Sequence, residues 1–337
     1  MNPARPRAAG TSTGRAPAAP AGSSLATVPR DSRLGPRPGG MGARRFFDVL
    51  ATQAFLTPLL FVFLALFVVP LGASVFLSFT NFNGYSTNFH FVGFSNYSSV
   101  LTNPQILGGL TFTVMYAVAT TVAVTVLAIP LAVVFNRRFF GRNFVRAALF
   151  FPAVPSLLVL GLVWAYIFAP ISSGVINSVL HTLFGMNPVL WLAEDRLAQL
   201  SVIIVGVWAQ TGWHAVLYLA YLQSVPRDYY DAAVVDGASS PQQFFRITLP
   251  LLAPAMTVSV VLLITGGLRV YELPLSMTGG GGPGYSTYTV TQNILLYGVS
   301  DGQYGPGSAL SVLFLVPVAT TFVVVLSALR WREARLR

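Results

Sequence analysis

Long apolar runs separated by short polar segments make up most of this chain. Six runs carry no charge, and each comes close to the roughly 20 residues that an α-helix needs to cross about 30 Å of hydrocarbon. The predicted spans are residues 54–79, 107–135, 147–169, 198–223, 251–268 and 308–329. This pattern predicts an all-α fold, that of a polytopic membrane protein with six transmembrane helices in a lipid bilayer.

Residues 1–45 interrupt this pattern, because they are rich in Ala, Pro, Gly, Ser and Arg. Such a segment buries too little apolar surface to offset the entropy of ordering the chain, so we predict a disordered tail. An organelle transit peptide has a similar composition, and this alternative stays open. Residues 46–337 are then the transmembrane domain.

The charged residues indicate the orientation of the chain in the membrane. Only 9% of the residues are charged, and all 20 basic residues are arginine. Except for Arg196 and Arg269, the arginines precede the first span, follow the last, or lie in the loops 136–146 and 226–250. Because cytoplasmic segments carry the excess of positive charge, we predict that these loops and both termini are cytoplasmic. The net charge of +10 therefore indicates membrane topology rather than nucleic-acid binding.

Several residue types are missing, and their absence excludes classes of chemistry. The sequence has no cysteine, which excludes disulfides, thiolate metal sites and cysteine nucleophiles. It has no lysine, so it lacks an intact Walker A loop, and any ATP with its Mg²⁺ would be bound by another chain. His90, His181 and His214 fall on different elements without a metal-site motif. We therefore expect no catalytic residues, no metal and no cofactor in this chain.

Residues 226–250 are a polar stretch between the fourth and fifth spans, and their pattern predicts two short helices joined at Gly237. An aspartate or serine can cap a helix, and a residue three positions later can complete a capping box. The predicted caps are Asp228 with Asp231 for the first helix, and Ser240 with Pro241 and Gln243 for the second.

The same stretch resembles the EAA loop of importer-type ABC permeases. The matching residues are Asp231, Ala232, Ala233, Asp236, Gly237, Ala238, Ile247, Leu249 and Pro250. The resemblance implies a cytoplasmic coupling helix that docks on a separate ATPase. Asp231 stands where the family usually has Glu, so the charge is kept on a side chain one methylene shorter. The alternative is an amphipathic helix pair lying on the membrane surface.

Two outer segments resemble sugar permeases in particular. Residues 91–101 resemble a segment that follows the first span of sugar permeases, and Met277–Thr287 resemble the LTGGGPGxST form of the first permease in carbohydrate importers. The glycine run at 279–282 is not a phosphate loop, because no GK[ST] follows it and Pro283 interrupts the backbone amides. We expect a flexible outer loop there.

These matches resemble the maltose, glycerol-phosphate and trehalose type of carbohydrate-uptake ABC importer. The resemblance implies the type I importer permease fold, a location in the cell membrane, and a heterodimer with a second permease. It also implies two ATP-binding subunits and an extracytoplasmic solute-binding protein. A permease for phosphate, polyamines or amino acids shares the EAA loop and remains an alternative. A secondary transporter would need a carboxylate within a span, and the predicted spans contain none.

The fourth span carries the candidate solute path. At 100° per residue, one face collects Gly206, Gln210, Trp213, His214, Leu217 and Tyr221, while Trp208 points the other way. Aromatic planes and amides suit a sugar, although hydrogen bonds between helices are the simpler interpretation. After the fifth span, Tyr271 and Glu272 follow Arg269. Arg269 and Glu272 either form an ion pair or line, with Tyr271, the outer mouth of the path.

Overall fold

The computed structural model describes residues 54 and 56–336, and the predicted disordered tail at 1–45 lies outside the described residues. Within this described part the chain is helical, and its only β feature is an isolated bridge between Thr80 and Phe91. Four helices there are long and apolar enough to cross a membrane, and two bent pairs raise the number of candidate spans to as many as six. The all-α prediction is confirmed.

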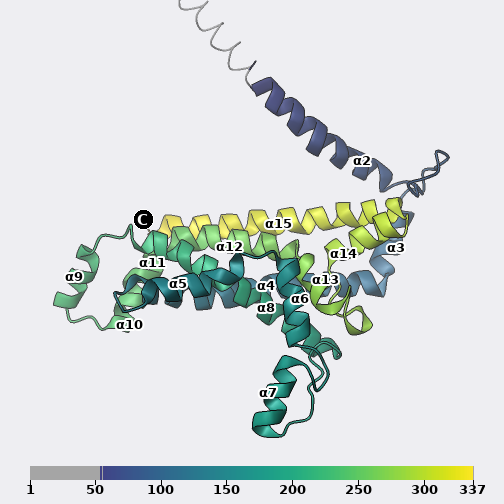
Figure 1. Ribbon diagram of the computed structural model, residues 1–337. Helices are drawn as coiled ribbons and strands as arrows, with labels where there is room; N and C mark the ends of the chain where they lie inside the picture. Colours follow the sequence, from purple (N-terminus) through teal and green to yellow (C-terminus); the bar gives the residue numbers. More distant parts are fainter. Residues whose placement is uncertain (1–53, 55, 337) are drawn as a thin grey trace, which may run out of the picture. The chain divides into compact units, whose positions relative to one another are not determined.

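Four helices of the unit that starts at Phe63 lie side by side (Figure 1). They are α4 (Pro104–Asn136), α8 (Asp195–Leu222), α12 (Ala253–Leu268) and α15 (Tyr304–Leu336). Shorter elements before and between them include η1 (Leu64–Val68), α2 (Val69–Leu77), α3 (Ser95–Thr102), α7 (Val175–Phe184), α13 (Glu272–Thr278), η4 (Pro283–Tyr285), α14 (Val290–Leu295) and η5 (Leu296–Ser300). The first apolar helix extends over Leu56–Leu77.

The ends and contacts of α4 follow from its sequence. Asn103 caps the helix, because its side-chain oxygen accepts the N–H of Gln105 at 2.9 Å. Near the other end, Phe135 packs with Tyr218 of α8 and Leu252, all three fully buried. Closer to the middle, a Cβ on Gly267 would reach the Cα of Ala117 at 2.7 Å. Glycine therefore allows the backbones of α12 and α4 to meet.

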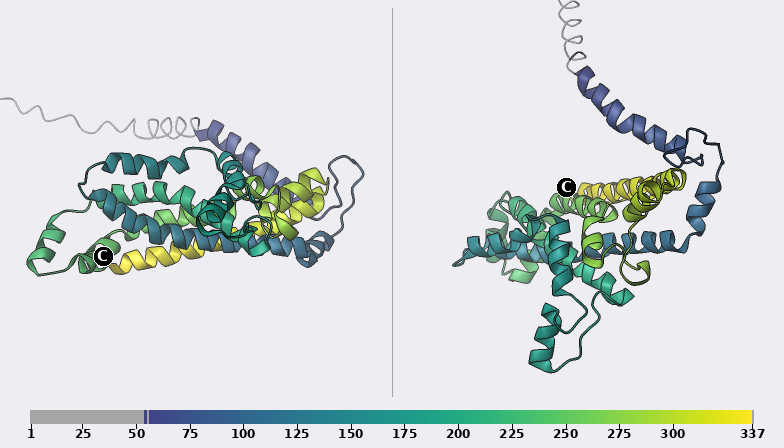
Figure 2. Two further views of the ribbon diagram at one scale, coloured as in Figure 1. Left: turned by 60° about the horizontal axis from the view of Figure 1, so that its bottom comes forward. Right: turned by 45° about the vertical axis from the view of Figure 1, so that its right-hand side comes forward.

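The third predicted span is not continuous. It consists of α5 (Arg142–Phe150), η2 (Phe151–Ala153) and α6 (Leu157–Ile167), and the two halves are bent by 96°. Pro152 and Pro155 lie at the break, where the lost backbone donors and fixed φ angles prevent a straight helix. Consequently α5 lies along α8, whereas α6 and α7 point away from it (Figure 2).

The fifth predicted span is also shorter than expected. Residues Ser240–Leu251 and α12 form a second bent pair, at 68°. Pro250 and Pro254 flank the bend. The helix that crosses the bundle therefore begins at Ala253 and not at Leu251.

The glycine-rich outer segment is folded, so the prediction of a flexible loop is wrong. The hydroxyl groups of Thr278 and Thr287 are 2.8 Å apart, and Thr287 is completely buried. The Gln199 side chain of α8 donates to the carbonyl of Ser286 at 2.8 Å. Local hydrogen bonds and this tie to α8 therefore hold the segment over the end of the bundle.

Candidate functional site

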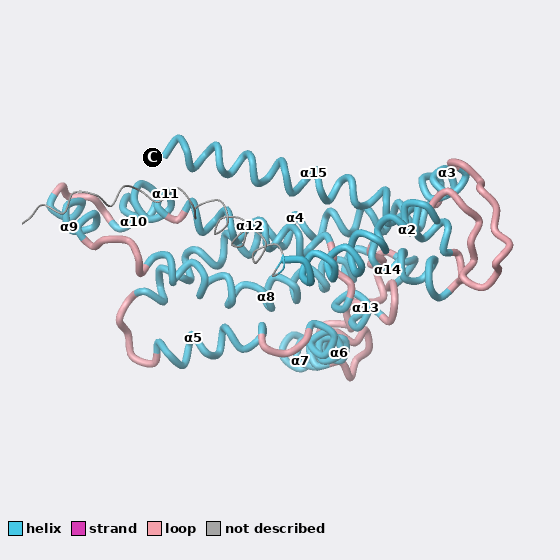
Figure 3. Tube along the Cα trace, turned by 90° about the horizontal axis from the view of Figure 1, so that it is seen from above, coloured by secondary structure: helices cyan, strands magenta, loops and turns pink. Residues whose placement is uncertain are grey.

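The predicted coupling loop lies at one end of the bundle, between α8 and α12, and forms two helices (Figure 3). They are α9 (Asp228–Val235) and α10 (Ser240–Gln243), followed by η3 (Phe244–Thr248) and α11 (Leu249–Leu251). The C-terminal end of α15 lies at the same end (Figures 1 and 3).

Gly237 separates the two helices, as the sequence predicts. Its φ is +77°, a left-handed conformation that glycine adopts without a steric penalty. The N–H of Ala238 donates to the carbonyl of Ala233 at 2.8 Å, and the N–H of Gly237 to that of Val234 at 3.0 Å. These two bonds form a Schellman motif, which ends α9.

Both predicted caps are wrong by one residue. Arg227 occupies the N-cap of α9 and makes no side-chain cap bond, so Asp228 is the first helical residue. Asp228 and Asp231 instead lie in the first turn, where the helix dipole favours negative charge. In α10 the cap is Ser239, whose N–H donates to Gln242 Oε1 at 2.7 Å, in place of the predicted pair Ser240 and Gln243.

The predicted coupling residues divide into an outer and an inner group. Asp231, Ala232, Asp236 and Gly237 are exposed, whereas Ala233, Ala238, Ile247, Leu249 and Pro250 are half-buried. A hollow of about 360 Å³ brings Ala233, Asp236, Gly237, Ala238 and Ile247 together. The outer group is therefore accessible on the surface of the loop, while the inner group packs within the loop and includes the start of α11.

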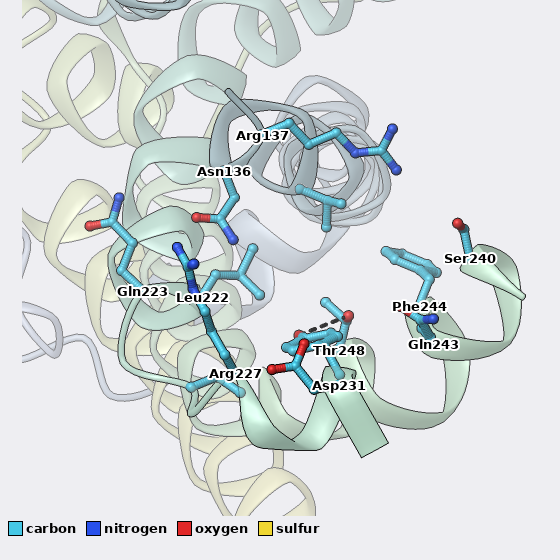
Figure 4. Close-up of a pocket in the computed structure, with 13 residues that line it drawn as sticks. Asn136, Arg137, Leu222, Gln223, Arg227, Asp231, Ser240, Gln243, Phe244 and Thr248 are labelled. Carbon is cyan, nitrogen blue, oxygen red and sulfur yellow. Dashed lines mark hydrogen bonds between the residues drawn. The ribbon is translucent and has the colours of Figure 1, made fainter. Parts of the chain in front are cut away.

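A larger cavity of about 470 Å³ lies between the loop and the ends of α4 and α8 (Figure 4). Asn136 and Arg137 line it from the end of α4, and Gln223 from the end of α8. Asp231 lines it from α9. At its edge, the hydroxyl groups of Tyr230 and Thr248 form a hydrogen bond of 3.1 Å. The loop is thus held away from the bundle over much of its length.

Two adjoining cavities lie farther along α8, and both are lined by Gln210. The first, of about 320 Å³, also includes Trp213 and His214. The second, of about 260 Å³, includes Tyr271 and Glu272. Five of the six predicted path residues therefore line one or both of these cavities, and Tyr221 lines neither.

The polar groups in these cavities differ in how they are bonded. His214 is 2% exposed, and its Nδ1 is 2.8 Å from Ser259 Oγ of α12, so the interhelical interpretation fits this residue. The Trp213 ring meets the imidazole edge to face at 4.7 Å. No hydrogen bond among the described residues involves the Gln210 side chain. Its amide is therefore available to a solute.

The cavity of about 260 Å³ contains residues that the sequence patterns did not indicate. Tyr116 and Thr120 contribute from α4, one turn apart. Their polar side chains at i and i+4 in an apolar run were the available signal. A Cβ on Gly206 would collide with the Tyr116 hydroxyl, so this glycine accommodates the tyrosine.

Arg269 and Glu272 line the same cavity, and no ion pair within 4 Å joins them although both are described. Of the two interpretations of the sequence, the one without an ion pair fits this placement, and the position of these residues at an outer mouth stays a prediction. On the opposite face of α8, Trp208 meets Trp164 edge to face at 5.2 Å. Trp208 therefore packs against α6, away from the two cavities.

The bundle, its broken third span and the exposed helix pair between α8 and α12 define a type I ABC importer permease. A chain in the crystal structure of a bacterial alginate ABC transporter, in complex with an alginate pentasaccharide-bound periplasmic protein, has the same fold. The TM-score is 0.70 at 21% sequence identity, over 84% of this chain and 94% of that chain. The family of binding-protein-dependent transport system inner membrane components matches residues 124–337, and this chain belongs to that family. It is a multi-pass membrane protein.

Named relatives agree with this class. A probable starch degradation products transport system permease protein, AmyD of Thermoanaerobacterium thermosulfurigenes, is 29% identical over 84% of this chain and 94% of its own length. The trehalose/maltose transport system permease protein MalF of Thermococcus litoralis is 33% identical over 82% of this chain and 92% of its own length.

Proposed function

We propose that this chain is the first permease of a heterodimeric sugar importer and that the two cavities along α8 are part of its solute path. The observation that carries the proposal is the position of Gln210, whose side chain lines both cavities. A solute entering near Glu272 would pass this amide before it reaches Trp213. The sugar-related names of the relatives support the choice of solute class.

The lining suits a sugar because it combines a flat aromatic surface with polar groups that bond hydroxyls. Trp213 is 36% exposed, and its indole can cover the apolar face of a pyranose ring. Gln210 can both donate and accept, and Glu272 accepts from hydroxyl donors. No covalent step is needed, since transport requires only that these bonds exchange with those of water.

The energy source lies on other chains. Without lysine this chain has no Walker A loop, so two copies of a separate ATPase bind ATP and Mg²⁺. One copy docks on α9, where the exposed carboxylate of Asp231 meets a basic group. A second permease completes the path, and an extracytoplasmic binding protein delivers the solute to the end of the bundle that carries the glycine-rich segment.

In this arrangement the loop end of the bundle is cytoplasmic, and so are both termini. The arginine distribution supports this orientation. The C-terminal end of α15 and the loop also lie at the same end of the bundle (Figure 3). This chain itself needs no bound cofactor for its role.

The test is ATP-driven uptake into proteoliposomes that contain this chain, the second permease, the ATPase and the binding protein. The probes are labelled maltose, trehalose and diacetylchitobiose. Gln210→Ala and Trp213→Ala should each reduce uptake of the accepted sugar by roughly threefold to tenfold, as expected for the loss of one hydrogen bond or ring contact. Gln105→Ala, at the start of α4 and outside both cavities, is the matched control.

Two results would count against the proposal. One is uptake of none of these sugars by an assembled complex that hydrolyses ATP. The other is an equal loss in the Gln210 variant and the Gln105 control, because a packing defect alone would then account for the effect.

A further inference from the structure

We propose that the hydrogen bond between Tyr230 and Thr248 is the positioning contact that transmits movement of α9 to α12. This inference rests on the proposed function, since it concerns how docking of the ATPase reaches the solute path. The bond joins the first helix of the loop to η3 at a distance of 3.1 Å (dashed line in Figure 4).

The rest of α9 is weakly attached to the bundle. None of its residues is buried, and only Tyr230 and Ala233, one turn apart, are half-buried. The cavity of about 470 Å³ separates α9 from the ends of α4 and α8. Within the described residues, Tyr230 supplies the one side-chain hydrogen bond from α9 to another element. A force applied to α9 therefore reaches the bundle through this side chain and through the backbone.

The two turns that join α9 to the rest of the chain transmit its movement less directly than the Tyr230 side chain does. On one side, α9 ends in the Schellman turn at Gly237, a residue with no Cβ and an exposed position. On the other side, it follows Ser224–Arg227, a short turn after α8 with mostly exposed residues. Turns of this kind absorb a rotation by small changes in φ and ψ. A tyrosine ring, with two rotatable bonds, is stiffer.

Thr248 is well placed to receive the movement. It is 4% exposed and is the last residue of η3. Its carbonyl accepts the N–H of Leu252 at 3.0 Å, which links it to the turn that begins α12. Farther along α12, Leu263 lines both solute cavities. A displaced Tyr230 hydroxyl therefore pulls on the base of a helix that forms the wall of the path.

Two neighbouring residues of α9 differ in what their side chains bond. Asp231 and Tyr230 both line the cavity of about 470 Å³ (Figure 4). Asp231 is exposed and makes no side-chain hydrogen bond to another described residue, so its carboxylate can pair with a basic group of the ATPase, whereas the Tyr230 hydroxyl is bonded to Thr248. Docking and transmission can therefore be impaired separately by substitution.

The experiment measures sugar imported per ATP hydrolysed by the complete reconstituted complex. Tyr230→Phe and Thr248→Val each remove one hydroxyl while keeping the shape of the side chain. Each should lower this ratio by roughly threefold to tenfold, the range expected for one neutral hydrogen bond. Thr248→Ser keeps the hydroxyl and should keep the ratio of the wild-type complex. The double variant should be no worse than either single variant, because both remove the same bond.

Stoichiometry of the purified complex is measured alongside the ratio, since the proposal requires it to be normal in every variant. An unchanged ratio in Tyr230→Phe and Thr248→Val overturns the proposal, as does an additive loss in the double variant. Loss of the ATPase from the Tyr230→Phe complex also overturns it, because the tyrosine would then act in docking.

These outcomes are distinct from failure of the proposed function. If the wild-type complex imports no sugar with ATP, the proposed function fails. If the wild-type complex imports sugar and Asp231→Arg abolishes import, while Tyr230→Phe keeps the normal ratio, only the role of the Tyr230 bond fails.

Discussion

Replacing Gly237 with valine tests the two-helix loop through its backbone alone. A Cβ at this position would meet no atom within 4 Å, so the substitution creates no collision within the chain. Its cost comes from φ, which is +77° and lies in a region that β-branched residues almost never adopt. Because the added side chain starts in open space, span packing and insertion should be normal.

The magnitude follows from the cost of a left-handed conformation, on the order of 1 to 3 kcal/mol for a residue of this kind. This cost lowers the population of the native turn relative to other turns by roughly 5- to 150-fold. In those other turns the Schellman bonds from Ala238 and Gly237 are lost, so α9 is displaced. We therefore expect a decrease in solute-stimulated ATP hydrolysis and uptake, of up to about fivefold for a cost of 1 kcal/mol and up to about 150-fold for 3 kcal/mol.

The assay is the ATPase activity of the purified complex, with and without loaded binding protein, at verified stoichiometry. Gly237→Asn is the matched control, since asparagine tolerates the left-handed region, and it should keep most of the activity. Normal stimulated activity in Gly237→Val would refute the role of this turn in coupling. An equal loss of activity in Gly237→Val and Gly237→Asn would also refute the backbone argument. The loss would then come from the presence of any side chain at this position and not from φ.

Two further predictions concern packing and orientation. A Cβ on Gly212 would collide with the carbonyl oxygen of Leu149, so Gly212→Val should separate α5 from α8 and lower the melting temperature of the purified complex, at a cost of about 1 to 3 kcal/mol. Gly108→Val, where a Cβ would meet nothing within 4 Å, should leave the melting temperature nearly unchanged, and a similar decrease in both variants would contradict the argument. In this cysteine-free chain, Ser240→Cys should react with an impermeant maleimide only from the cytoplasmic side, and Tyr85→Cys, at a position 86% exposed, only from outside; the reverse pattern would exclude the proposed orientation.

The sequence predicted where helices lie better than where they bend. The bounds of α4 and α8 follow from polar residues at their ends, such as Asn103 and Asp195. A hydropathy profile counts apolar residues and does not record the direction of the helix axis, so it could not reveal the 96° break near Pro155. The prolines were visible, but membrane helices often contain proline without breaking.

The caps show a different limit. Ser239 with Gln242 and Ser240 with Gln243 have the same spacing, so the capping-box pattern alone cannot choose between them. The helix starts where the chain leaves the turn at Gly237, and this depends on the length of the connection. The structure selects Ser239, with its N–H bonded to Gln242.

For the proposed solute path, the helical periodicity of the sequence identified which face of α8 carries the polar residues, but not how far along the helix axis each cavity extends. Gln210 and Tyr221 share a face but are 11 residues apart, or about 16 Å along the helix at 1.5 Å per residue. Tyr221 therefore lies beyond the two cavities that Gln210 lines. Tyr116 of α4 was missed for a related reason, since its place beside Gln210 depends on which helices pack together.

The wide turn η3 has a consequence for the evolution of the loop. A π-turn contains one residue more than the α-helix it interrupts, so deletion of one residue from Phe244–Thr248 would restore regular α-helical winding. Because the wide turn already accommodates the extra residue, the helices on either side would keep nearly the same direction after such a deletion. The loop can therefore lose one residue at this turn without redirecting α9. Among related chains, a length change of one residue in this turn would disturb the docking surface less than the same change elsewhere in the loop.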